Sequence, residues 1–365
     1  MNTIARVGEH CFGCTACKHL CPVGCIRMKP DEKGFLYPLV DETTCIDCGL
    51  CLQACPAIKD EQTGSELFPD TLVYAAKHQN DRSRGMSASG GAFTAISDHI
   101  LEKHGTVYGA GYDNTMKVCH MRTVSSEQRD RLRGSKYVQS DLGDIFKEVE
   151  QDLKDGRGVL FSGTPCQVAG LRAYLQTEYE KLLLVDLLCY GVPSPKVFSE
   201  YLSQVEEREG KPLINCTFRD KEKGWRSLVL NLDFGSRKIL LDAPDSPYYA
   251  LFLKGTTLRP SCYACPFCSF DRPGDITIGD FWGIEDTLAE FEDEKGVSLV
   301  LVNSQKGEHA FQGFSQHLEY IRSTHEACLQ PAVSKPTPPG KDKDMFWQEY
   351  ALFGYPYVAN KYGRP

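Results

Sequence analysis

A repeated run of cysteines near the N-terminus constrains this chain more than any other feature of its sequence. The pattern Cys-x-x-Cys-x-x-Cys-x-x-x-Cys-Pro occurs over residues 11–22 and again over residues 45–56. Three thiolates in one tight loop can bind one side of an iron–sulfur core, and the fourth ligand must then come from another segment. Two zinc sites or a disulfide lattice are the alternatives, but the repeated spacing together with both prolines favours iron–sulfur ligation.

The same spacing is typical of bacterial ferredoxins that hold two [4Fe-4S] clusters, in which the fourth cysteine of each run binds the other cluster. We therefore predict a 2[4Fe-4S] ferredoxin domain over residues 1–60. We expect Pro22 and Pro56 to turn the chain away from each cluster. The predicted ligands are Cys11, Cys14, Cys17 and Cys55 for one cluster, and Cys45, Cys48, Cys51 and Cys21 for the other.

The number and placement of cysteines also bear on the cellular compartment. Nine of the seventeen cysteines precede residue 56 and the others are dispersed, which favours metal ligation in a reducing compartment over a disulfide scaffold. The N-terminus lacks the apolar segment of a signal peptide, and no apolar run is long enough to span a bilayer. We therefore expect a cytoplasmic protein without a membrane span. The formal charge of −8 argues against nucleic acid as a partner, because nucleic-acid binders concentrate basic side chains.

Strand-like and helix-like segments alternate after a polar, turn-rich stretch at residues 60–70, which we interpret as a linker. This order predicts an α/β layer with a mostly parallel sheet, followed by antiparallel strands over residues 213–241. Residues 331–344 are predicted to be an extended linker, and the aromatic segment 345–362 is expected to dock on the body. Strands are predicted near residues 72–76, 106–112, 118–124, 158–163, 182–188 and 297–303, and helices near residues 92–104, 141–154, 165–175 and 195–207.

A further group of cysteines lies downstream. Cys166 and Cys189 follow two predicted neighbouring strands, and ligands collect at the carboxyl ends of such strands. A loop with ligand spacing, residues 262–268, supplies three more thiols, one of which is surplus if both strand cysteines bind, so the role of Cys268 is left open. The sequence thus predicts a third cluster close to a cofactor. The remaining cysteines are interpreted as structural: Cys25, Cys119, Cys216 and Cys328.

Three glycine-containing segments could hold an anionic group. Residues 89–91 open a predicted helix, where glycine lets free backbone N–H groups approach a phosphate. Residues 134–139 and 163–164 are comparable, and Lys136 could neutralise a pyrophosphate. In each segment glycine could instead serve only to turn the chain. The basic segment 219–226 could hold an anionic substrate beside Trp225, or form a solvated hairpin.

Five segments together resemble the beta-subunit family of coenzyme F420 hydrogenase/dehydrogenase. They are residues 89–93, 134–138, 163–167, 186–193 and 275–280, and the resemblance covers about residues 70–330. It implies FAD, a [4Fe-4S] cluster, and electron passage between iron–sulfur centres and a two-electron acceptor such as the deazaflavin coenzyme F420. It also implies residues for each site. The FAD pocket would involve Gly90, Gly91, Lys136, Tyr137, Thr164 and Gln167, and the flavin-side cluster would be held by Cys166, Cys189, Cys262 and Cys265.

With this resemblance the fold class becomes α+β: a small ferredoxin-type two-cluster domain, then a larger α/β flavin-binding domain with a mixed sheet. The expected divisions are a ferredoxin domain at 1–60, F420 hydrogenase beta-subunit-like N-terminal and C-terminal regions at 70–155 and 156–330, and a linker with an aromatic segment at 331–365. The chain departs from the family pattern over residues 262–275, where Cys268 is additional.

The leading functional hypothesis is an iron–sulfur flavoprotein oxidoreductase in which no particular side chain is assigned as catalytic. Its expected partners are a ferredoxin or another redox protein and a small-molecule electron acceptor or donor, with a homo-oligomer as an open alternative. Two other hypotheses remain. The chain could be a non-catalytic electron-transfer and docking subunit of a larger reductase or hydrogenase, or a substrate-specific reductase in polysaccharide or pigment biosynthesis.

Overall fold

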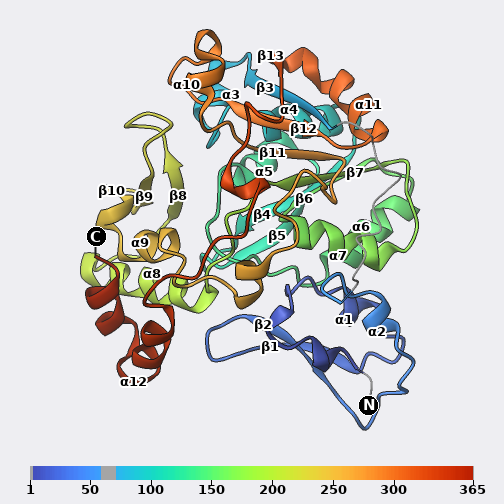
Figure 1. Ribbon diagram of the computed structural model, residues 1–365, viewed down its shortest axis with the longest axis vertical. Helices are drawn as coiled ribbons and strands as arrows, with labels where there is room; N and C mark the ends of the chain where they lie inside the picture. The colour runs from blue at the N-terminus through green and yellow to red at the C-terminus, as the bar shows by residue number, and fades with distance from the viewer. Residues whose placement is uncertain (1–2, 59–70, 365) are drawn as a thin grey trace.

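The computed structural model describes residues 3–58 and 71–364, and Figure 1 shows a small N-terminal unit packed against a larger body. The predicted linker at residues 60–70 lies outside the described residues. No described helix is both long enough and apolar enough to cross a membrane. All seventeen cysteines lie in the described part of the chain, and none of them forms a disulfide there.

The N-terminal unit repeats one local structure twice, as its sequence repeats one motif twice. In each cysteine loop a residue in the left-handed conformation, Thr15 with φ 65° or Gly49 with φ 74°, precedes a short helix. The unit contains the 3-10 helix η1 (Ile4–His10), helices α1 (Ala16–Leu20) and α2 (Leu50–Gln53), and an antiparallel hairpin of β1 (Ile26–Pro30) and β2 (Leu36–Val40).

An eight-stranded mixed sheet forms the centre of the larger body, in the order β13-β3-β12-β11-β7-β6-β4-β5. Strands β4, β6, β7 and β11 run parallel, whereas the four remaining pairings are antiparallel. The expectation of a mixed sheet is confirmed, and the expectation of a mostly parallel one is wrong. The strands are β3 (Leu72–His78), β4 (Thr106–Tyr112), β5 (Val118–Thr123), β6 (Val159–Gly163), β7 (Leu182–Leu187), β11 (Ile276–Asp280), β12 (Ser298–Val302) and β13 (Leu318–Ser323).

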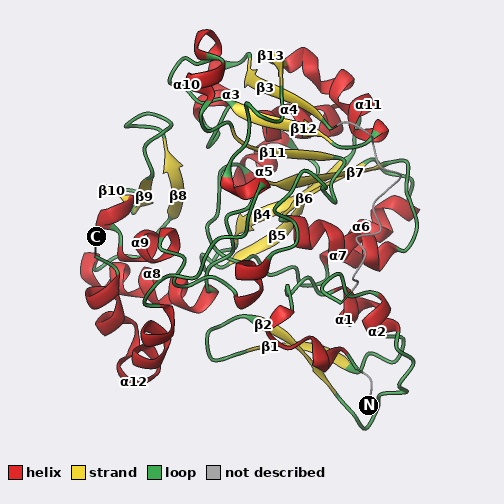
Figure 2. Cartoon of the chain, in the orientation of Figure 1, coloured by secondary structure: helices red, strands yellow, loops and turns green. Residues whose placement is uncertain are grey.

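Helices cover both faces of this sheet (Figure 2). Helices α4 (Ala92–Glu102) and α11 (Gln305–Phe314) share one apolar core with it, and α6 (Ile145–Lys154) and α7 (Pro165–Leu175) share another. Helix α7 begins with the predicted capping box of Thr164 and Gln167 and has Pro165 at its first position. Shorter helices are α3 (Asp81–Gly85), α5 (Ser126–Arg129) and α10 (Ile284–Thr287).

A second, three-stranded antiparallel sheet of β8 (Asn215–Asp220), β9 (Val229–Asp233) and β10 (Lys238–Asp242) follows, as predicted. It shares an aromatic core with α8 (Pro195–Glu209), α9 (Pro247–Leu253) and α12 (Lys343–Tyr362). The predicted docking of the C-terminal aromatic segment is confirmed, because Phe346, Tyr350 and Tyr355 are buried in this core. Gly354, with φ 74°, divides α12 into two helical parts.

The N-terminal unit contacts the larger body at the side formed by α6 and α7 (Figure 1). Helix α1 packs on both of these helices, and η1 packs on η4 (Pro260–Ala264). Gly170 in α7 permits the closest approach, since a Cβ at that position would lie 2.6 Å from the Cβ of Cys14. The packing therefore brings the first cysteine loop directly against α7.

Candidate functional site

Four cysteines of the N-terminal unit gather in its interior, and we call them the inner group: Cys11, Cys14, Cys17 and Cys55. All four are buried, and Cys55 from the second run interacts electrostatically with Cys14 and Cys17 from the first. Burial raises the pKa of the Cys14 and Cys17 thiols, so these sulfurs become thiolates only when a cation stabilises them. The crossed pairing expected from the sequence is thus the one that the fold brings together.

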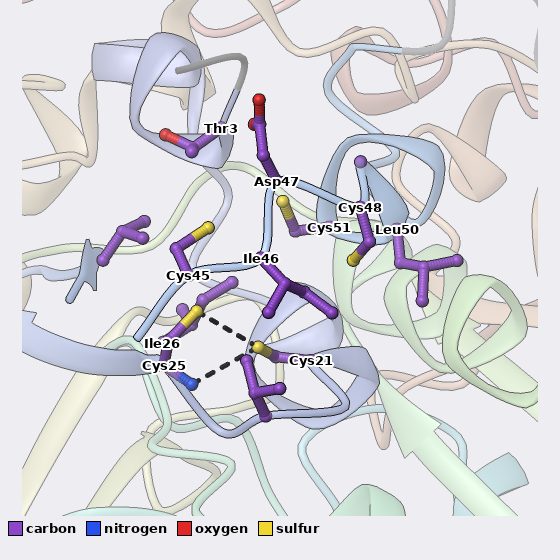
Figure 3. A pocket seen from close by; sticks show the side chains of 13 residues that line it. Thr3, Cys21, Cys25, Ile26, Cys45, Ile46, Asp47, Cys48, Leu50 and Cys51 are labelled. Atoms are coloured by element: carbon purple, nitrogen blue, oxygen red, sulfur yellow. Dashed lines mark hydrogen bonds between the residues drawn. The ribbon is translucent and has the colours of Figure 1, made fainter. Parts of the chain in front are cut away.

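The outer group comprises Cys21, Cys45, Cys48 and Cys51, which line a small cavity (Figure 3). Cys51 interacts electrostatically with Cys17 and Cys55, so the two groups are neighbours. Cys48 is exposed, and the apolar side chains of Ile46 and Val23 beside it are 61% and 43% exposed. The outer group is therefore the one that reaches the surface.

A third group forms where β6 and β7 end. Cys166, in the first turn of α7, and Cys189, which follows β7, interact electrostatically with each other and with the loop over residues 262–268. A buried ion pair of 2.7 Å between Arg272 and Asp186 holds that loop in place. A hydrogen bond from the Cys268 thiol lowers the pKa of the Cys265 thiol to about 7. Five thiols are thus brought together: Cys166, Cys189, Cys262, Cys265 and Cys268.

The three groups have the features of cluster-binding loops. Backbone N–H groups point at sulfur, with Gly13 N 3.3 Å from Cys11 Sγ and Val192 N 3.5 Å from Cys262 Sγ. Among the described residues no three His, Cys, Asp or Glu side chains converge as one metal ion requires. A [4Fe-4S] core presents its irons at separate corners, so its four thiolates need not converge on one point. Each group supplies at least the four thiolates that such a core takes.

Arg259 lies between the inner and third groups and is 1% exposed. Its Nε donates to Cys11 O at 2.6 Å, one terminal nitrogen donates to Leu36 O at 2.9 Å, and the other donates to Gln139 Oε1 at 2.9 Å. Its guanidinium also lies 4.4 Å from the ring centroid of Tyr37. One buried cation therefore fastens the first cysteine loop and the N-terminal hairpin to the larger body.

A large cavity, with about 1350 Å³ of empty space, opens at the carboxyl ends of β6, β7 and β11. Its lining includes Cys189, so it adjoins the third group directly. Five of the six residues predicted for the FAD pocket line it, namely Gly91, Lys136, Tyr137, Thr164 and Gln167. Gly90 does not line it, because Gly90 is packed against Ala76 O and Ser298 N, where a Cβ would lie 2.3 and 2.4 Å from these atoms.

The ammonium group of Lys136 is directed at backbone carbonyls, whereas the expected contact with a pyrophosphate requires it to face the cavity. Its Nζ donates to three carbonyls of its own loop, those of Arg131, Arg133 and Gly134, at 2.7–3.3 Å. Burial lowers the pKa of Lys136 to about 7. In this geometry the ammonium group orders the loop that borders the cavity.

A chain of hydrogen bonds that the sequence analysis missed lies beside the cavity. Gln167 Nε2 donates to Ser140 Oγ at 2.9 Å, Ser140 Oγ lies 2.9 Å from His120 Nδ1, and His120 Nε2 lies 3.1 Å from Ser162 O. Burial lowers the pKa of His120 to about 4, so the ring is neutral at pH 7 and donates through Nε2. A histidine within the predicted strand 118–124 was the only signal in the sequence.

Arg133 is a second residue that the sequence analysis missed. It lines the cavity next to Gly134, and its Nε is buried without a hydrogen-bond partner among the described residues. An acceptor from an anionic ligand would satisfy it, which is consistent with a phosphate-bearing cofactor. The left-handed Gly91 before α4 and this unsatisfied donor would both suit the phosphate of such a cofactor.

The basic segment 219–226 has its charges paired within the protein. Arg219 forms an ion pair of 2.6 Å with Asp280 and Lys223 one of 2.8 Å with Asp242, while Lys221 Nζ donates to three backbone carbonyls. Arg226 contacts two glutamates. The segment is neither a simple solvated hairpin nor a free anion site.

The thiol groups and the cavity define an iron–sulfur oxidoreductase, and comparison with known proteins identifies its type. Residues 156–324 match the family model for the C-terminal part of the coenzyme F420 hydrogenase/dehydrogenase beta subunit, and residues 10–58 match the 4Fe-4S dicluster domain. The chain thus joins a segment that matches the dicluster domain to a segment that matches the C-terminal part of this beta subunit.

Several known proteins are similar to this chain. An uncharacterized protein of Methanocaldococcus jannaschii is 23% identical over 343 residues, covering 83% of this chain and 86% of that protein. The coenzyme F420-dependent sulfite reductase of the same organism is 28% identical over 207 residues, which are 55% of this chain but only 31% of the reductase. A chain of the F420-reducing [NiFe] hydrogenase complex from Methanosarcina barkeri has 16% identity and a TM-score of 0.48, covering 80% of this chain and 90% of that one.

Proposed function

We propose that the protein passes electrons between ferredoxin-type [4Fe-4S] clusters and a two-electron organic substrate through FAD. The observation that carries this proposal is the position of Cys189, which belongs to the third thiol group and also lines the large cavity. A cofactor in that cavity would touch the iron–sulfur site without an intervening layer of protein. FAD supplies the exchange between two-electron and one-electron chemistry.

The residues around the cavity have distinct roles in this proposal. Gly91 and Thr164 lie at the beginnings of α4 and α7, where helix dipoles favour phosphate, although the Thr164 N–H itself donates to Gln167 Oε1 at 3.0 Å. Tyr137 supplies an aromatic wall, since its ring stacks on Phe252 at 4.6 Å. Gln167 ties the beginning of α7 to the hydrogen-bond chain beside the cavity.

The thiol groups form a row from the cavity to the surface. The third group adjoins the cavity, the inner group meets α7 one helical turn after Cys166, the outer group neighbours the inner group, and Cys48 is exposed. Such a row suits one-electron transfer between a buried site and a redox protein. The exposed apolar side chains of Ile46 and Val23 would meet that partner, because apolar surface rimmed by polar groups is typical of docking sites.

Coenzyme F420 is our proposed substrate, because one relative is named as F420-dependent and the matching family model is that of F420 enzymes. The test is anaerobic turnover by the isolated chain, in which F420 absorbance is followed against a low-potential viologen dye. Turnover with F420 supports the proposal. A flavin-containing chain that turns over other two-electron acceptors but not F420 would instead support a substrate-specific reductase, and a chain that binds no flavin and turns nothing over would support the docking-subunit alternative.

A further inference from the structure

Cys25 lies among the outer group although the repeated motif does not include it. Its Sγ is 3.3 Å from Cys21 Sγ, and its thiol also contacts that of Cys45. Figure 3 shows Cys25 on the wall of the same small cavity, with its backbone N–H also directed at Cys21 Sγ. The outer group therefore contains five thiols around a site that takes four.

The surroundings of Cys25 differ from those of a packing cysteine. Cys216 is also buried, but it packs among aromatic rings, where its thiol contacts the hydroxyl of Tyr112. Cys25 contacts two sulfurs that the sequence and the fold both assign to a cluster. The interpretation of Cys25 as merely structural leaves these contacts unexplained.

The backbone holds Cys25 at this place. Cys25 O accepts from Asp41 N at 2.8 Å, and β1 begins at the next residue. Between Cys21 and Cys25 the chain makes a tight turn with Gly24 at φ 64°, and the three residues of the turn are exposed. One end of the turn is thus anchored to the hairpin, while the turn itself borders solvent.

We propose that Cys25 is a reserve ligand of the outer cluster, able to take the iron corner that Cys21 holds. In the exchange the Fe–S bond to Cys21 breaks, an Fe–S bond to Cys25 forms, and the Cys25 thiol proton passes to the departing Cys21 sulfur. No electron is gained or lost. The inference rests on the proposed function only in requiring that the outer group hold a cluster.

The experiment compares wild type, Cys21→Ala, Cys25→Ala and the double variant, each purified anaerobically. Iron and acid-labile sulfide are counted per chain, and the reduced proteins are examined by electron paramagnetic resonance. We expect about twelve irons in wild type and in both single variants, with the outer-cluster signal altered in Cys21→Ala. The double variant should contain about eight irons. Cys48→Ala is the matched control, since Figure 3 shows Cys48 apart from the Cys21–Cys25 pair, and it should lose iron as a single variant.

The outcomes separate this inference from the proposed function. Loss of about four irons from Cys21→Ala alone, with wild type intact, would overturn the role of Cys25 and leave the proposed function standing. A wild type that lacks the outer cluster would overturn both. Thermal unfolding of each variant shows whether iron loss reflects loss of a ligand or failure of the N-terminal unit to fold.

Discussion

Arg259 fastens the N-terminal unit to the larger body, and replacing it by methionine tests this directly. Methionine keeps much of the volume but removes three hydrogen bonds, those to Cys11 O, Leu36 O and Gln139 Oε1. Each hydrogen bond contributes roughly 1 kcal/mol net, and the three acceptors lose a buried partner. The free energy holding the first cysteine loop in place should fall by about 3 kcal/mol, which is about a hundredfold in its opening equilibrium.

Amide hydrogen exchange measures this opening locally. In Arg259→Met, exchange of the amides over residues 11–17 should accelerate about a hundredfold, while the amides of β6 and β7 keep their wild-type rates. Arg259→Lys should lie between the two, because an ammonium keeps the charge but not the fork of donors. Arg237→Met is the matched control, since Arg237 is exposed and forms an ion pair with Glu209 at the surface. Unchanged exchange at residues 11–17 in Arg259→Met would refute the argument.

Three other predictions concern packing, pH and the cavity. Gly170→Ala gains roughly 1 kcal/mol of helix propensity but places a Cβ 2.6 Å from the Cβ of Cys14, so the iron content and the melting temperature should fall. Gly158→Ala is the control, because a Cβ at that position would meet no atom within 4 Å, and it should leave both quantities unchanged. Folding lowers the pKa of His120 from 6.5 to about 4, so as the pH falls the unfolded chain takes up the imidazole proton before the folded chain does. About 3 kcal/mol of the free energy of unfolding should therefore be lost between about pH 6.5 and pH 4. Urea titrations should show this slope flattened in His120→Gln and unchanged in the exposed variant His309→Gln. Lys136→Met removes three hydrogen bonds from the loop that borders the cavity and should weaken flavin affinity about tenfold or more, as measured by fluorescence; unchanged affinity would assign the loop no role.

Local signals explain most of what the sequence predicted correctly. The capping box before α7 and the short apolar segments of β6 and β7 depend on neighbouring residues, and both elements form where predicted. The adjacency of Cys166 and Cys189 followed from the order of these elements, because consecutive strands joined by a helix usually lie side by side.

Other features depend on contacts that a sequence does not display. The edge strand β13 (Leu318–Ser323) is mostly exposed, so it carries no buried apolar run, and β11 (Ile276–Asp280) is short and ends in Gly279-Asp280. The direction of strand pairing was misjudged because it depends on long-range connections. Whether Lys136 faces a ligand or its own carbonyls, and whether Cys25 meets another sulfur, also follow only from the folded arrangement.

The central claim is a row of three cluster sites leading from a flavin cavity to the surface. Its most direct test is anaerobic purification of the full chain, with iron, acid-labile sulfide and flavin measured per chain alongside the absorbance spectrum. We predict about twelve irons, an equal amount of sulfide and one FAD. About eight irons without flavin would contradict the claim, because the third thiol group and the cavity beside Cys189 would then hold neither cofactor.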